Sequence, residues 1–268
     1  MKTLIAFSVV AAAASAATAG SIGNAVSANG INNFLTESIT VDIAYDGNAM
    51  TNGSWSGGDM FGITSRATVG SSGMPFAMGD DSAGSFPPDT QGIINAGDNG
   101  FFFGVVDTDN SNNPSLRGAA EWTFDITGNT SLSVDISAAA MGDFEISAAP
   151  GPDFNNFTWS IDGSAPAPLF TTSVDEAADQ NYTMEGGAVV NLSDPMSMNG
   201  VLLNNNFQTI NSLIAGSGAT LTIAYDGGGN SGSEAFAFRD LNVNGVPTPG
   251  SIALVGLGGL AAARRRRA

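Results

Sequence analysis

Carboxylates are the side chains of this sequence that are best able to do chemistry. The 268 residues include 25 Asp and Glu, no His, no Cys and a single Lys, Lys2. The chain therefore lacks the residues for Ser-His-Asp or Cys-His catalysis, for His- or Cys-ligated zinc, for iron–sulfur clusters and for an internal lysine Schiff base. Two uses of carboxylates remain: the acid pair of a glycosidase, and oxygen ligation of a hard cation such as Ca²⁺.

The densest set of oxygen ligands is the segment DTDNSNN at residues 107–113. Asp107 and Asp109 stand two residues apart and amides follow them, so the segment can wrap around Ca²⁺, which prefers about six to eight oxygens. It departs from an EF-hand, because Asn112 and Gly118 stand where that loop requires Gly and Glu. The alternative is a solvated turn in which Asx side chains bond to their own backbone.

Three further carboxylates complete the predicted Ca²⁺ ligands. Asp143 and Glu145 would share one face of a strand, and their mutual repulsion favours a cation or an Arg between them. A Ca²⁺ ion shared with Asp107 or Asp109 would meet that need. Asp240, near the end of the last predicted strand, is the remaining candidate, with a salt bridge or a turn as its alternative. Acids two residues apart on one strand do not oppose each other across a cleft, so no catalytic pair is predicted.

Tryptophan supplies a second kind of candidate contact, because its ring can stack on a sugar. Trp122 and Trp159 occupy apolar positions of alternating segments, which favours core packing. Trp55 stands instead in the polar segment GSWSGG, and it is predicted to be an exposed ligand contact.

The elements that must position these residues are predicted to be short strands. Apolar and polar residues alternate with a period of two in several segments, each of which ends close to Gly, Asn or Asp. These segments are residues 39–45, 122–126, 132–136, 157–161, 221–225 and a last strand at 235–243. The pattern predicts an all-β fold, a two-sheet β-sandwich of jelly-roll type.

Gly, Asn and Asp between the strands predict how the strands are connected. Residues 127–131 (TGNTS) are predicted to close the segments on either side of them into a hairpin. Turns are predicted to end four strands at Asp46-Gly47, Asp162-Gly163, Asp226-Gly227 and Asn244-Gly245. Residues 49–100, rich in Gly, Ser and Met, are predicted to be long loops that decorate a single body at 20–245.

The N-terminus has the pattern of a signal peptide. Lys2 precedes an apolar run at residues 4–14, and Ala17-Thr18-Ala19 fits the small-x-small rule for cleavage between Ala19 and Gly20. Cleavage after Ala16 is the competing cut. Residues 1–19 are therefore predicted to be a signal helix, and the chain is predicted to be exported.

The C-terminus, residues 246–268, has a different targeting pattern. Val246-Pro247-Thr248-Pro249 precedes an apolar run at 252–263, which is followed by Arg264, Arg265, Arg266 and Arg267. As a helix this run spans ~18 Å, which is short against a ~30 Å hydrocarbon core. Snorkelling Arg side chains, retained in the cytoplasm, would extend its reach. A short hydrophobic helix is predicted, one that is short for a permanent membrane anchor.

Charge separates the body from its two ends. Without Lys2 and the four terminal Arg, three Arg face 25 acids, which leaves a net charge of −22. A surface of this charge repels phosphates, so nucleic-acid binding is excluded. Divalent cations, in contrast, could link such a body to acidic glycans.

The C-terminal pattern resembles the PEP-CTERM sorting signal, in the order Pro motif, short apolar segment and Arg cluster. That resemblance implies export by a Gram-negative-type bacterium, processing by an exosortase and association with exopolysaccharide. Thr248 stands where the usual Val-Pro-Glu-Pro motif has Glu. The body at about 101–245 also resembles jelly-roll modules of secreted bacterial surface proteins, which implies a binding or adhesive role. The motifs that carry this second resemblance lie at residues 99–109, 141–145, 159–164 and 234–240.

The sequence thus predicts an exported, non-enzymatic protein of the cell surface or extracellular matrix. Its predicted partners are an exosortase and extracellular polysaccharide, and its predicted cofactor is Ca²⁺. Two alternatives stay open. One is an extracellular carbohydrate-active enzyme that uses carboxylates alone, and the other is a structural subunit of the envelope or surface layer.

Overall fold

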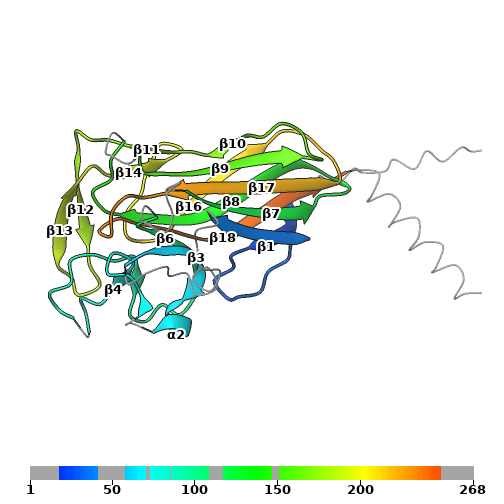
Figure 1. The fold of residues 1–268 in the computed structure, drawn as a ribbon. Coiled ribbons are helices and arrows are strands. Elements are labelled where there is room, and N and C mark those ends of the chain that lie inside the picture. The colour runs from blue at the N-terminus through cyan, green and yellow to red at the C-terminus, as the bar shows by residue number, and fades with distance from the viewer. Residues whose placement is uncertain are drawn as a thin grey trace, which may run out of the picture.

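A computed structural model describes residues 18–41, 58–70, 73–84, 86–108, 117–146 and 151–248 (Figure 1). Most of the predicted signal helix (residues 1–17) and the predicted C-terminal helix lie outside these ranges, as do Trp55 and Asp109. Within the described ranges, no helix is both long enough and apolar enough to cross a membrane.

Two antiparallel sheets form the body. The first has the strand order β16-β8-β18-β6-β3, with β1 also paired to β18, and the second has the order β10-β9-β17-β7-β2. The first sheet consists of β1 (Gly20–Ala25), β3 (Met60–Ser65), β6 (Phe101–Val106), β8 (Asn129–Met141), β16 (Gln208–Ile214) and β18 (Ala235–Pro247). The second consists of β2 (Thr36–Val41), β7 (Gly118–Asp125), β9 (Phe154–Ile161), β10 (Ala167–Phe170) and β17 (Thr220–Gly228).

Smaller elements surround the two sheets. They are α2 (Arg66–Val69), the parallel pair β4 (Gly79–Asp80) and β5 (Ile94–Asn95), the hairpin β12 (Asp179–Thr183) and β13 (Val189–Ser193), and the small sheet β11 (Thr172–Val174), β14 (Met196–Met198) and β15 (Val201–Leu202). In Figure 1, α2 and β4 lie below β6 and β18, while β9 and β17 lie above them.

The path of the chain between the sheets is that of a jelly roll. From β6 to β18 the long strands fall in the first, second, first, second, second, first, second and first sheet. Each sheet therefore interleaves strands from distant parts of the chain, as a double-sheet jelly roll requires. The predicted β-sandwich fold is confirmed.

The predicted hairpin at residues 127–131 is wrong. The strand before it, β7, pairs with β2 and β17, whereas the strand after it, β8, pairs with β16 and β18. The connection is an arch between the sheets, and Gly128 turns it with a φ of 76°. Trp122 of β7 and Val134 of β8 both belong to the core between the sheets. Alternation identifies the inward face of each strand, but it does not distinguish paired strands from facing ones.

Two of the predicted turns are also wrong, because their glycines serve close packing. Strand β17 continues through Asp226-Gly227 and β18 through Asn244-Gly245. A Cβ at Gly227 would collide with the Tyr225 hydroxyl, and a Cβ at Gly245 would lie 2.6 Å from Ile22 Cδ1. The turn at Asp162-Gly163 is confirmed, with φ values of 50° and 72°. Asp46-Gly47 lies outside the part of the chain that the structure describes.

Phe238 lies at the centre of the aromatic core between the sheets. Its ring stacks on Phe103 at 4.9 Å and lies 5.0 Å from Phe157 and 5.1 Å from Tyr225, between ring centroids. Trp122, fully buried as predicted, approaches it edge-on at 6.0 Å. These rings come from both sheets, so their packing fixes how the two layers sit on each other.

The outer face of the first sheet carries a second apolar cluster. Phe102, Met141 and Ala237 point outward from β6, β8 and β18 and pack against residues of the 58–95 region and of β12. The partners are Met60, Met74, Ala77, Met78, Ile93 and Ile94, together with Tyr182 of β12 and Met184, which follows β12. The predicted loop-rich stretch therefore forms a third layer whose core is shared with the sheet.

We expect Phe238→Ala to lower the free energy of unfolding by about 3–5 kcal/mol, because it removes the ring that links the aromatic side chains of both sheets. Leu213→Ala is the control, since Leu213 is 78% exposed on β16 and should change stability by less than about 0.5 kcal/mol. Urea unfolding followed by fluorescence measures both. Equal effects of the two substitutions would contradict this view of the core.

Candidate functional site

Three carboxylates converge where three distant segments meet. Glu145 follows β8, Asp153 precedes β9 and Glu234 precedes β18. Each offers an oxygen that lies within 4.8 Å of the oxygens of the other two. Asp153 and Glu234 are only 4% and 3% exposed, and Glu145 is half-buried. Among the described residues this carboxylate cluster is the one group of three or more acids close enough to share an ion.

Backbone hydrogen bonds hold Asp153 in this position. Its carboxylate accepts from the Glu145 amide at 2.6 Å and from the Asn230 amide at 3.0 Å. The Asp153 amide in turn donates to the Glu145 carbonyl at 2.7 Å. Unlike Asp153, each of the two glutamates has a buried Oε2 with no hydrogen-bond partner within the described part of the chain. Such orphaned charged oxygens are costly to bury.

The cluster is also unusual in its charge. Burial, followed by the charges of Asp153 and Glu145, raises the pKa of Glu234 to about 10. Burial likewise raises the pKa of Asp153 to about 6, although backbone N–H groups oppose that shift. No described arginine is left to compensate: Arg66 pairs with Asp81, Arg117 with Asp226, and Arg239 with Asp98 at 2.8 Å.

Of the predicted Ca²⁺ ligands, the structure brings Glu145 into the cluster. Asp143 lies in the loop after β8 rather than in a strand, and its carboxylate accepts from the Ser193 hydroxyl at 2.6 Å. Asp107 lies close by, against Gly232 in the loop that leads to Glu234. Asp240 accepts from the Ala28 amide at 3.0 Å and so helps to fix a turn. Asp109 and the predicted sugar contact Trp55 lie outside the described residues.

Asp153 and Glu234 were not among the ligands predicted from the sequence. Glu234 directly precedes the apolar strand AFAF, and Asp153 directly precedes FNNF, so each acid adjoins a segment that must be buried. This position beside a buried strand was the sequence signal that could have identified the two acids. No spacing rule could join them, because the cluster forms only when the loops of three strand ends meet.

A second feature is a hollow on the outer face of the second sheet, with a volume of about 660 Å³. Strand register forms two rows across β9, β17 and β7: Thr158–Ala224–Glu121 and Asn156–Asp226–Ala119. The small side chains of Ala119 and Ala224 leave the depression, and the Arg117–Asp226 ion pair stands beside it. Ala119 and Arg117 are exposed on this face, and β11 approaches its edge, where the Thr172 amide donates to Asn156 Oδ1 at 3.0 Å.

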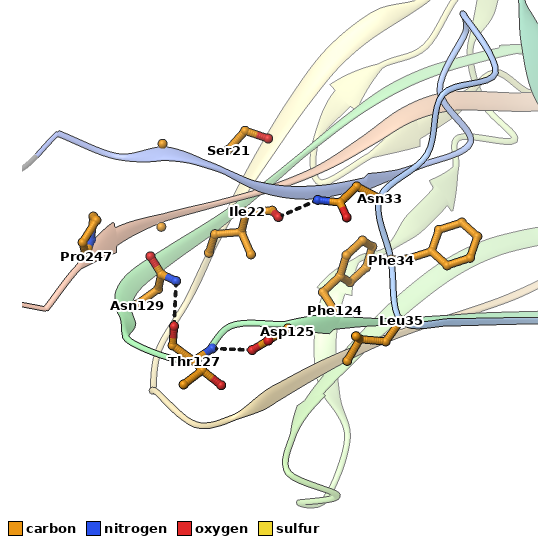
Figure 2. Close-up of a pocket in the computed structure, with 12 residues that line it drawn as sticks. Ser21, Ile22, Asn33, Phe34, Leu35, Phe124, Asp125, Thr127, Asn129 and Pro247 are labelled. Carbon is orange, nitrogen blue, oxygen red and sulfur yellow. Dashed lines mark hydrogen bonds between the residues drawn. The ribbon is translucent and has the colours of Figure 1, made fainter. Parts of the chain in front are cut away.

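A third feature is a pocket of about 490 Å³ at the end of the sandwich (Figure 2). It lies between the start of β1, the end of β18 and the end of β7, and Ile22 and Phe124 line it. Figure 2 shows hydrogen bonds at its rim, from Asn33 to the Ile22 carbonyl and from the Thr127 amide to Asp125. Pro247 beside it lies at the end of the last strand.

Comparison with known proteins gives no family. No family model and no curated protein matches the chain. The cyclase Fisc from Fischerella sp. TAU, solved with an indole derivative, is 11% identical over 85% of this chain and 100% of its own, with a TM-score of 0.39.

Two xylan-related structures are less similar. The CBM22-1–GH10 modules of Clostridium thermocellum xylanase 10B, complexed with xylohexaose, are 7% identical over 56% of this chain and 22% of their own, with a TM-score of 0.25. The CBM22-1 xylan-binding domain of Paenibacillus barcinonensis Xyn10C is 6% identical over 55% and 83%, with a TM-score of 0.19. These scores are too low to transfer function, and the fold assignment stands on the strand order.

We expect the metal-free protein to lose stability as the pH rises from about 5 to about 9. The folded pKa of Glu234, about 10, lies above its ordinary value of 4.5, so the folded state binds the extra proton between these limits. Unfolding then becomes easier with rising pH, by up to about 1.4 kcal/mol per pH unit. Glu234→Gln should flatten this slope, measured by urea unfolding in chelator.

The matched control for that measurement is Glu121→Gln on the exposed sheet face. It makes the same substitution without touching the cluster, and it should keep the wild-type slope. A Glu234→Gln slope equal to that of the wild type would show that Glu234 is ionised in the folded protein at neutral pH.

Proposed function

We propose that the chain is an exported, non-enzymatic protein of the cell surface or extracellular matrix that binds extracellular polysaccharide through the outer face of its second sheet. The observation that carries this proposal is the hollow of about 660 Å³ on that face. Sugar-binding sites are concave and combine apolar floor with a few fixed polar groups. The hollow meets both conditions.

The chemistry of the hollow suits sugar hydroxyl groups. Its floor consists of methyl groups from Ala119 and Ala224, which can contact the C–H surface of a ring. Beside it lie the Thr158 hydroxyl and the side-chain amide of Asn156, whose Oδ1 accepts from the Thr172 amide at 3.0 Å. Arg117 is held by Asp226 and by the ring of Phe154, 5.2 Å from the guanidinium carbon, so its donors are already oriented.

The carboxylate cluster does not have the geometry of a glycosidase pair. Hydrolysis of a glycoside needs two acids on opposite sides of the bond, about 5–10 Å apart and open to a sugar. In the carboxylate cluster all three oxygens converge within 4.8 Å, and two of the acids are almost fully buried. Three carboxylate oxygens this close together suit a single ion between them better than a sugar ring.

Export and exosortase sorting belong to the proposal and rest on the two ends of the sequence. Strand β1 begins at Gly20, so cleavage after Ala19 would leave it intact. At the other end, Val246 and Pro247 are the last residues of β18, opposite Thr130 and Asn129. The Thr248 amide donates to the Gly128 carbonyl at 2.8 Å. The motif therefore begins on the folded body, and Pro249 and Arg264–Arg267 lie beyond the described residues.

We expect protein recovered from outside the producing cell to begin at Gly20 and to lack Arg264–Arg267. Signal peptidase removes the leader, and an exosortase removes the tail that held the chain in the inner membrane. Intact-mass spectrometry and N-terminal sequencing read both ends. A secreted chain that retains its four terminal Arg would contradict exosortase processing, whatever its N-terminus.

We expect Ala224→Trp to weaken glycan binding at least about tenfold, or about 1.4 kcal/mol, because the indole fills the hollow. The measurement is binding of the full chain to a glycan array, with and without Ca²⁺, followed by titration of the strongest glycan. Thr209→Trp is the control, since Thr209 is exposed on the outer face of the first sheet and should leave affinity unchanged. Absence of glycan binding in both conditions would contradict the proposal.

A further inference from the structure

We infer that Glu145, Asp153 and Glu234 form a binding site for one hard divalent cation, with Ca²⁺ as the preferred ion. Three segments deliver these acids to one point, with their oxygens within 4.8 Å of one another. The site shares Glu145 with the ligand set predicted from the sequence, and Asp153 and Glu234 are new. Its ligands are separate from the residues that line the hollow on the second sheet.

The unpaired oxygens point to a ligand. Oε2 of Glu234 belongs to a side chain that is 97% buried, and it has no hydrogen-bond partner in the described chain; Oε2 of Glu145 is unpaired in the same way. A folded protein rarely buries such acceptors without water, a cation or a donor. One oxygen of each glutamate and one of Asp153 lie within 4.8 Å of one another, a spacing that suits one shared ion.

The positive charge that balances the cluster must come from solution, as a proton or as a metal ion. The three arginines of the described chain are committed to Asp81, Asp226 and Asp98. Backbone N–H groups reach Asp153, but they do not neutralise a group of three acids. A divalent ion supplies the missing positive charge at the point where the three carboxylates meet, and it turns their repulsion into attraction.

The ligand chemistry selects the kind of ion. All three donors are carboxylates, and a chain without His or Cys offers no soft ligand to complete a zinc or copper site. Ca²⁺ accepts mono- or bidentate carboxylates in irregular geometry, with water to fill its shell. Mg²⁺ demands near-octahedral geometry at shorter distances, which a set of acids fixed by three separate loops meets less well.

An ion at this point would cross-link the sandwich. Glu145 follows β8 of the first sheet, Asp153 precedes β9 of the second sheet, and Glu234 precedes β18, the last strand. Ligation would therefore tie both sheets to the β17–β18 loop. Because an ion that binds only the folded state stabilises it by mass action, Ca²⁺ should raise the melting temperature.

Calcium titration of the chelator-treated full chain by calorimetry tests the site. We expect about one ion per chain, with affinity reduced at least about tenfold in Glu234→Gln and in Glu145→Gln. Asp143→Asn is the matched control, because Asp143 is an exposed acid two residues from Glu145 that points to Ser193 instead. It should keep wild-type affinity to within about twofold and keep the Ca²⁺-dependent rise in melting temperature.

The Gln variants also report on folding. Replacing one acid of a cluster that has no positive side chain by its neutral amide should leave the metal-free melting temperature equal to or above that of the wild type, so loss of Ca²⁺ binding cannot be attributed to unfolding. Three outcomes would overturn the inference: no binding of Ca²⁺ by the wild type at millimolar concentration, equal binding by Glu234→Gln, or binding of Mg²⁺ without Ca²⁺. Glycan binding is a separate readout, so failure of either proposal is visible on its own.

Discussion

The scarcity of positive charge governs how this sandwich is held together. Three arginines serve a body that carries all 25 acids, and each of them is tied to one Asp. The remaining buried acids must find other partners, and most find backbone amides. Asp80 accepts from the amides of Ser82 and Glu185, for example, and thereby ties the 58–95 layer to the β12–β13 hairpin. Acids thus replace ion pairs as the connectors between loops.

In the carboxylate cluster, backbone amides do not pair with all of the acids. Asp153 follows the rule and accepts two backbone amides, but the glutamates beside it bring two oxygens that the described chain leaves unpaired. A protein with spare lysines would neutralise this point from within. In a chain whose net charge is −22 outside its terminal segments, a proton or a metal ion is the remaining source of positive charge.

The sequence predicted the sandwich better than its connections. Alternation located the inward face of β7 correctly, and Trp122 is a core residue because apolar side chains at every second position must face one layer. The arch at residues 126–129 was mistaken for a hairpin, since facing and pairing strands have the same pattern. At the site, Glu145 was predicted from a neighbouring acid. Asp153 and Glu234 were not, because their proximity is a product of the jelly-roll topology.

The cluster and the hollow lie at the same end of the second sheet. Asp153 directly precedes Phe154, whose ring lies 5.2 Å beneath the Arg117 guanidinium, and Arg117 holds Asp226 in the hollow. Gly228, opposite Phe154, opens the loop that carries Glu234. An ion that fixes Asp153 and Glu234 would therefore also fix the base on which Arg117 rests. The two sites are separate in their ligands, yet the rigidity of the binding face would depend on the charge balance of the cluster.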